Sequence, residues 1–220
     1  MRRLTFLGFI ICAIATTAPA QEGGSIVGQV QGNTYIAPSG TYRIIIPVLE
    51  QLGGTISDTE NVVVFQDQYN VHVSVGCFLQ DATQRWELST RGLKEYLTHF
   101  FNNYVLPDFQ RIFAGARIES TVFDAKLMDG ALIAYTLLPG GTMFAQRVAV
   151  IGGDAAAPVA KRGNLLFIRN GYIYVVSVEL AERVLEGTAY SRTTAEEDAL
   201  LRRRLADLMN AMQFTKPTAQ

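Results

Sequence analysis

The most constraining feature of the sequence is the apolar run on either side of Asn170-Gly171, NLLFIRNGYIYVVSVEL. An Asn-Gly pair between two stretches rich in aromatic and β-branched residues is the strongest short-range signal of a β-hairpin with a two-residue turn. Side chains alternate along a strand, so Tyr174 and Val176 share one face while Ile173 and Val175 share the other. Both faces are apolar. Strands of this kind belong near the centre of a sheet that is covered on two sides.

Other β-rich runs predict further strands. The segment GALIAYTLLP (130–139) is also apolar on both faces, and Asp129-Gly130 before it is a turn signal. The short link around 66–70 predicts that the runs flanking it pair as an antiparallel hairpin. The remaining predicted strands are two within TYIAPSGTYRIIIP (34–47) and one each within ENVVVFQD (60–67), YNVHVSVGCF (69–78), ARIESTVFDAKLM (116–128) and FAQRVAVI (144–151).

Two helices are predicted by the spacing of apolar residues. From Leu93 to Val105 they recur at one helical face, with Ser89 or Thr90 as the cap and Pro107 as a kink or stop. The second helix begins at a capping box formed by Thr194 and Glu197, and Phe214 after it closes onto the core. Its apolar face is formed by Leu201, Leu205, Leu208 and Met212.

These elements predict an α+β fold. We expect a central, mainly antiparallel sheet of about six to eight strands with helices on both sides, an α/β/α sandwich. The predicted organisation is a secretory signal peptide over 1–20, a flexible leader over 21–33, a single α+β domain over 34–215 and a C-terminal tail over 216–220.

The signal peptide is predicted by Arg2 and Arg3, the apolar run that follows them, and an Ala-Pro-Ala ending at Ala20. The chain is therefore expected to be exported, and to be periplasmic or secreted after cleavage near Ala20. We expect no transmembrane segment in the mature chain, since spanning needs about 20 apolar residues. Losing two of the 19 basic residues leaves 17 against 20 acidic ones, and this net charge of −3 disfavours nucleic acid as a partner.

The segment NVHVSVGC (70–77) holds His72 and Cys77, and the question is whether they form one site. On a strand they point to opposite faces because five positions separate them, unless Gly76 forms a bulge. Cys77 is then expected to be a small buried hydrophobe beside three valines, and His72 a residue of the polar face. His99 lies off the apolar stripe of its helix and is expected to be solvated. Two histidines and one mature cysteine are too few to predict a zinc site or an internal disulfide.

Other catalytic signals are weak. The sequence contains no G-x-S-x-G elbow, no G-x-G-x-x-G fingerprint and no Walker loop. Glu119, Asp124 and Asp129 could pair for acid–base chemistry, but their spacing singles out no pair. Arg202-Arg203-Arg204 is interpreted as a solvated helix face, with a docking patch for an acidic partner as the alternative. No residue is assigned to catalysis, to a cofactor or to a metal, and the ligand-binding residues stay undetermined.

The order of elements, with "TYIAPSGTYRIIIP" at the front and "LADLMNAMQF" at the end, resembles the PsbP-like α/β/α sandwich superfamily. The resemblance covers nearly the whole mature chain and implies a central antiparallel sheet with helices on both sides. It also implies binding or assembly rather than catalysis, and no functional residue is carried over from it.

The function predicted from the sequence is that of an exported, non-catalytic accessory or binding protein of the cell envelope, without a cofactor. Its partner would be an envelope protein or a small ligand, and the oligomeric state is left open. One alternative is an enzyme whose site is assembled from distant residues, around His72, Asp124 or Tyr135. Another is a structural protein that self-associates through an unpaired strand at a sheet edge.

Overall fold

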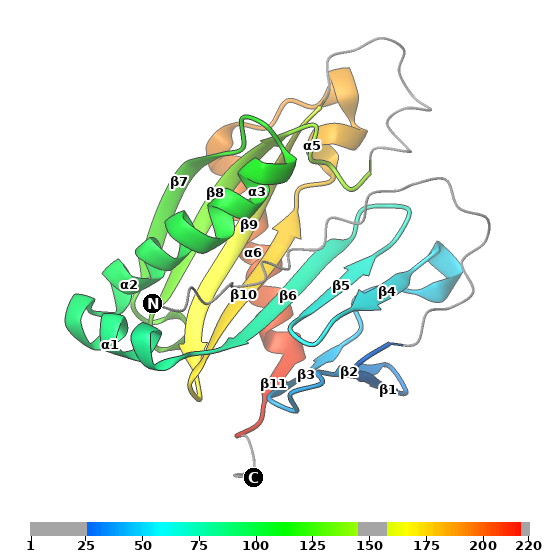
Figure 1. Cartoon of the computed structure of the whole chain (residues 1–220). Coiled ribbons are helices and arrows are strands. Elements are labelled where there is room, and N and C mark those ends of the chain that lie inside the picture. The colour runs from blue at the N-terminus through cyan, green and yellow to red at the C-terminus, as the bar shows by residue number, and fades with distance from the viewer. Residues whose placement is uncertain (1–25, 145–157, 217–220) are drawn as a thin grey trace.

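A seven-stranded antiparallel sheet forms the centre of the molecule, in a computed structural model that describes residues 26–144 and 158–216. The strand order is β4-β5-β6-β10-β9-β8-β7, and every neighbouring pair is antiparallel (Figure 1). The predicted fold class is confirmed. The strands are β4 (Thr55–Asp58), β5 (Val62–Gln66), β6 (His72–Leu79), β7 (Arg117–Asp124), β8 (Ala131–Pro139), β9 (Val159–Arg169) and β10 (Tyr172–Glu179).

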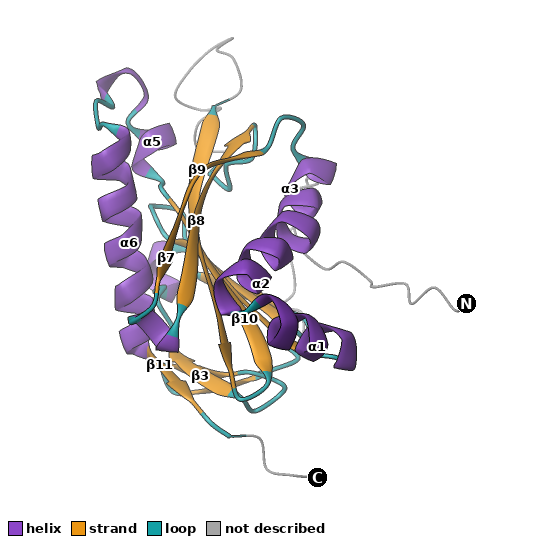
Figure 2. Cartoon of the chain, turned by 90° about the vertical axis from the view of Figure 1, so that its left-hand side faces the viewer, coloured by secondary structure: helices purple, strands orange, loops and turns teal. Residues whose placement is uncertain are grey.

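Helices cover both faces of this sheet, as the apolar strand faces require (Figure 2). One face carries α1 (Ala82–Arg91), α2 (Leu93–Phe100) and α3 (Leu106–Ile112), and the other carries α6 (Thr194–Ala211). Ile173 and Val175 pack under the α1–α3 layer, whereas Tyr174 and Val176 pack on the α6 side. The short helix α5 (Glu182–Leu185) connects β10 to α6.

A second, four-stranded sheet joins the two ends of the domain and was not predicted. Its order is β1-β2-β3-β11, with β1 (Gln29–Gln31), β2 (Thr34–Ile36), β3 (Tyr42–Ile45) and β11 (Met212–Phe214). Phe214 in β11 contacts the rings of Phe167 and Tyr174 edge-on, so it does close onto the core. Strand β1 lies within the predicted leader over 21–33, and its pairing with β2 makes Gln29–Gln31 part of the small sheet.

The first helical region is longer than predicted and is interrupted twice. Asp81 caps α1 in a capping box with Gln84, while the hydroxyls of Ser89 and Thr90 donate to the Trp86 carbonyl instead of capping a helix. Gly92 separates α1 from α2 with a backbone φ of 78°. The sequence signals for this longer region are Asp81, a cap twelve residues before Leu93, and the single glycine Gly92.

Pro107 was predicted to kink or stop the helix, and the predicted stop does not occur. A π-helical turn, Phe101–Val105, precedes it, and the Leu106 N–H bonds to the Phe101 carbonyl. The proline then occupies the first turn of α3, where a missing N–H costs nothing. The wider turn gives room to the proline ring, so the chain stays helical to Ile112.

The other predicted boundaries shift by small steps. The capping box of α6 is Thr193 with Glu196 rather than Thr194 with Glu197. Asn170 and Gly171 have φ values of 52° and 79°, as the predicted hairpin turn requires. The turn before β8 is longer than two residues, because a 3-10 turn, Leu127–Asp129, precedes Gly130.

Some predictions fall on residues that the structure does not describe. They are the signal peptide over 1–20, most of the tail over 216–220, and the predicted strand over 144–151, of which only Phe144 is described. Within 26–144 and 158–216, no helix is both long enough and apolar enough to cross a membrane.

Candidate functional site

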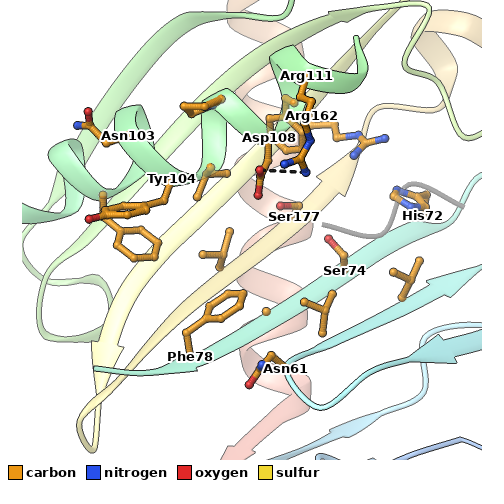
Figure 3. Close-up of a pocket in the computed structure, with 18 of the residues that line it drawn as sticks. Asn61, His72, Ser74, Phe78, Asn103, Tyr104, Asp108, Arg111, Arg162 and Ser177 are labelled. Atoms are coloured by element: carbon orange, nitrogen blue, oxygen red, sulfur yellow. Dashed lines mark ion pairs between the residues drawn. The ribbon is translucent and has the colours of Figure 1, made fainter. Parts of the chain in front are cut away.

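A pocket of about 350 Å³ lies between the α2–α3 helices and the strands β5, β6 and β10 (Figure 3). The helices pack against β7 and β8, so their cover of the sheet ends before β5 and β4 (Figure 1). The floor of the pocket is built from the side chains of three neighbouring strands that point toward the helices. They are Val64 from β5, Ser74, Gly76 and Phe78 from β6, and Val175 and Ser177 from β10.

The wall opposite this floor comes from the interrupted helix and combines apolar side chains with the polar Asn103, Asp108 and Arg111. Phe100, Val105 and Phe109 are buried between the helices and the sheet, and Pro107 lines the pocket beside them. Tyr104, in the π-helical turn, lies on the pocket rather than in the core, and 40% of it is exposed. The π-helical turn therefore affects the pocket directly, because it sets which side chains of 101–107 face the strands.

Gly76 keeps the floor of the pocket open. A Cβ at this position would lie 2.7 Å from the Phe78 ring, so any other residue would displace that ring. The strand has no bulge here, since Gly76 pairs in register with Val175 and Val62. His72 and Cys77 therefore point to opposite faces, as predicted: Cys77 is in the α6-side core and His72 lines the pocket.

One end of the pocket is polar and centres on Arg162, from β9. The Arg162 Nη2 donates to the Gly141 carbonyl at 3.0 Å and lies 3.6 Å from the Glu179 Oε2. Glu179 is fully buried and also accepts from the Thr142 hydroxyl at 2.6 Å and from the Met143 N–H at 3.1 Å. The Nδ1 of His72 lies 3.8 Å from the same carboxylate.

Burial shifts the proton equilibria of this polar end. Loss of water contact and the nearby Arg162 guanidinium both lower the pKa of His72 well below its ordinary value, so His72 is neutral at pH 7. Burial raises the pKa of Glu179, and the Arg162 charge and the two hydrogen bonds from Thr142 and Met143 oppose that rise.

Two buried polar atoms at this end have no hydrogen-bond partner. They are the Nε of Arg162, in a side chain that is 4% exposed, and the Nδ1 of His72, in a side chain that is 3% exposed. Buried donors and acceptors nearly always have a hydrogen-bond partner, so two unpaired atoms in residues that line one pocket are unusual. It identifies the place where a bound molecule would complete the hydrogen bonding.

The residues considered for an assembled catalytic site are not brought together. His72 lines the pocket, whereas the Tyr135 hydroxyl lies on the α6 side of the sheet and donates to the Asp198 carbonyl at 3.1 Å. Asp124 ends the edge strand β7 and pairs with Arg202 at 2.5 Å. These three positions lie on different faces and edges, because strand alternation and strand order separate them.

The remaining candidates also have structural roles. Glu119 contacts the buried Lys161, whose Nζ lies 3.0 Å from Glu197 and 2.6 Å from Asp198. Asp129 lies in the turn before β8, and His99 is partly exposed on α2. Within the arginine run, Arg202 pairs with Asp124 and Arg204 with Glu182, while Arg203 is exposed. In the described part of the chain, no three His, Cys, Asp or Glu residues form a group that could hold a metal ion.

The sequence reasoning missed the pocket residues Arg162 and Ser177, and Glu179 behind them. A signal for them exists, because a two-residue turn at Asn170-Gly171 dictates which residues face each other across the hairpin. In the structure Arg162 pairs with Glu179 in exactly the register that this turn dictates, and Asn164 pairs with Ser177. The opposed charges of Arg162 and Glu179 could thus have been found from the turn alone.

The fold and the pocket together define an α+β sandwich with a ligand-sized pocket beside one of its helix layers. No family model matches the chain, and no curated protein matches it either. The chain is similar to the solution structure of the cyanobacterial PsbP (CyanoP) from Synechocystis sp. PCC 6803, with 12% identity, a TM-score of 0.49 and coverage of 90% of this chain and 98% of that one.

A second similar structure is the Ran-binding protein Mog1p from Saccharomyces cerevisiae, with 9% identity and a TM-score of 0.48. The match covers 86% of this chain and 96% of that one. The superfamily resemblance predicted from the element order is thus represented among the similar structures. At these identities the similarity concerns the fold alone and supports no function.

Proposed function

We propose that this chain is an exported, non-catalytic binding protein that holds a small, largely apolar molecule in the pocket between β5, β6, β10 and the α2–α3 helices. The observation that carries the proposal is the pocket itself. Its volume of about 350 Å³ falls within the range of small-molecule sites, which runs from roughly 300 to 1,000 Å³. An apolar wall with a few polar groups at one end is the usual chemistry of such sites.

The contacts at the polar end favour binding over catalysis. The Ser177 hydroxyl donates to the Asn164 Oδ1 at 2.7 Å, and Asn164 in turn donates to the Ala134 carbonyl and the Thr136 hydroxyl. A serine nucleophile needs its hydroxyl to donate to a base, so this arrangement holds Ser177 in a structural role. Export is supported by the basic, apolar and Ala-Pro-Ala segments of residues 1–20.

The test is a binding measurement on protein recovered from the exported fraction of cells that express the full chain. Its intact mass should match a chain that begins at Gln21. The neutral, apolar fluorophore N-phenyl-1-naphthylamine should bind with a stoichiometry of one and an increase in fluorescence. Ser74→Trp, which fills the pocket floor, should reduce the affinity at least about tenfold, since a bulky side chain removes the space itself.

Ser57→Trp is the matched control, because Ser57 is an exposed residue of the edge strand β4 and does not line the pocket. It should bind the fluorophore as the wild type does. The binding proposal is wrong if the wild type does not bind the fluorophore, or if Ser74→Trp binds it unchanged. A full-length mass, with the protein retained inside the cells, would overturn export.

A further inference from the structure

We propose that the natural ligand is an amphipathic molecule with a carboxylate head group, which binds the Arg162 guanidinium, and an apolar tail, which lies along β6 toward Phe78. This inference rests on the proposed function and specifies the ligand of the same pocket. Its basis is the unpaired Nε of Arg162, a buried donor on the pocket lining.

The first step of the argument is the geometry of Arg162. The guanidinium presents a rigid fork of donors that suits a carboxylate. Its Nη2 already donates to the Gly141 carbonyl, whereas its Nε has no partner. Glu179 lies 3.6 Å away, beyond hydrogen-bonding distance, so it balances the charge of Arg162 without using the fork.

The second step is the charge on the lining. Asp108 and Arg111, which line the pocket near Arg162, pair with each other at 3.2 Å (Figure 3). The counter-ion of Arg162 is Glu179. Glu179 is not among the lining residues and is fully buried. A bound molecule therefore meets the Arg162 guanidinium directly and its counter-ion only behind the lining, so an anionic head group can approach the cation more closely than it approaches Glu179.

The third step is the second unpaired atom. His72 faces the pocket from β6, and its Nδ1 lacks a hydrogen-bond partner. Figure 3 shows His72 and Arg162 at the same end of the pocket, with Ser74 and Ser177 beside them. A carboxylate has two oxygens with several lone pairs, so it can accept from Arg162 and from a second donor at once.

The fourth step is the position of the tail. Away from Arg162 the apolar lining residues Val64, Val105, Val175 and Phe78 form a continuous strip, with the uncharged Asn61 and Asn103 at its far end (Figure 3). His72 and Phe78 lie six residues apart on one strand, a length of about 20 Å at the usual rise per residue. The pocket therefore offers a charged end and an uncharged, mainly apolar remainder in the order that an alkyl carboxylate needs.

The experiment compares octanoate with octanamide, its neutral analogue of the same length, by isothermal titration calorimetry on the mature protein. The wild type should bind octanoate at least about tenfold more tightly, as expected for a hydrogen bond to a charged group. The double variant Arg162→Gln/Glu179→Gln removes both charges together and leaves neither one unmatched. It should lose this preference while its affinity for octanamide stays within about twofold.

The two proposals fail in different ways. Equal affinities of the wild type for octanoate and octanamide would overturn the carboxylate inference and leave the binding function standing. Binding of neither compound and of no neutral fluorophore would overturn both. If the double variant does not fold, the Nε–H signal of Arg162 in a ¹⁵N spectrum of the wild type decides: a shift with octanoate alone supports the inference, and no shift overturns it.

Discussion

At the residue scale, the molecule buries two adjacent cations on opposite faces of one strand. Lys161 points to the α6 side, where Glu119, Glu197 and Asp198 surround its ammonium group. Arg162 points to the pocket and has a single carboxylate, Glu179, within 4 Å in the described residues. Lys161 is thus satisfied by the protein alone and Arg162 is not, which is why the pocket, rather than the α6 side, is the candidate binding site.

His72 makes the stability of the protein depend on pH in a defined direction. Its pKa in the folded protein lies well below the ordinary value of about 6.5, which the unfolded chain retains. Below pH 6.5 His72 therefore binds a proton in the unfolded state but not in the native state, and the free energy of unfolding falls as the pH falls. Glu179 opposes this effect, because its raised pKa favours the native state in acid.

We therefore expect His72→Gln to weaken the loss of stability between pH 6.5 and 5. One proton contributes at most about 1.4 kcal/mol per pH unit to the slope of the free energy of unfolding against pH. Subtracting the slope of the variant from that of the wild type separates the contribution of His72 from that of Glu179. Urea unfolding at a series of pH values measures it. Ser57→Gln, a change between uncharged residues at an exposed position of β4, is the control and should keep the wild-type slope. An unchanged slope in His72→Gln would contradict the prediction.

At the scale of elements, two interruptions in the α1–α3 layer determine which of its side chains face the pocket. Gly92 turns the chain between α1 and α2 with φ 78° and ψ 161°, a conformation that is accessible almost only to glycine. The π-helical turn Phe101–Val105 then accommodates Pro107 and places Tyr104 on the pocket. An uninterrupted helix of the same sequence would present a different set of side chains to β5 and β6.

Gly92→Ala should destabilise the protein by about 1–3 kcal/mol. The loss would come from backbone strain alone, because a Cβ at this position meets no atom within 4 Å. Chemical denaturation measures the change in the free energy of unfolding. Lys94→Ala, at an exposed position in the first turn of α2, should change it by less than about 0.5 kcal/mol. A Gly92→Ala variant as stable as the wild type would show that this bend can relax.

At the scale of the whole molecule, Asp58 ties the small sheet to the large one. It lies at the end of β4 and accepts hydrogen bonds from the N–H groups of Val27 and Gly28 at 2.9 and 2.7 Å. It also accepts from the Tyr35 hydroxyl of β2 at 2.7 Å. Burial and the Asp58 carboxylate both raise the pKa of Tyr35, so this hydroxyl stays protonated and remains a donor.

Asp58→Ala removes three hydrogen bonds at once and should loosen the N-terminal strands. We expect faster amide hydrogen exchange over 29–36, equivalent to a local loss of about 1–3 kcal/mol, with little change in β8 and β9. Ser57→Ala, in the same strand but exposed, is the control and should exchange as the wild type does. Unchanged protection over 29–36 would mean that the pairing of β1 with β2 holds this segment without Asp58.

The features that could be predicted from the sequence are those that depend on neighbours along the chain. The Asn170-Gly171 turn and the alternation of Ile173 with Tyr174 predict a central, doubly covered hairpin. The same alternation separates His72 from Cys77. The register set by the Asn170-Gly171 turn would also have paired Arg162 with Glu179. Helix boundaries were less accurate, because the cap of α1 at Asp81 lies outside the apolar stripe that identified the helix.

The sequence by itself determined the sandwich and the two faces of each strand, because side-chain direction follows from local periodicity and short turns. Only the tertiary structure decided where the pocket lies. Its opening depends on how far the α2–α3 helices extend over β5 and β6, and its polar end depends on Thr142, His72 and Glu179 meeting from three separate segments. The strand pairing of the small sheet also depends on the tertiary structure, because β3 and β11 come from opposite ends of the chain. No local pattern encodes such contacts, because they exist only when the distant segments pack together.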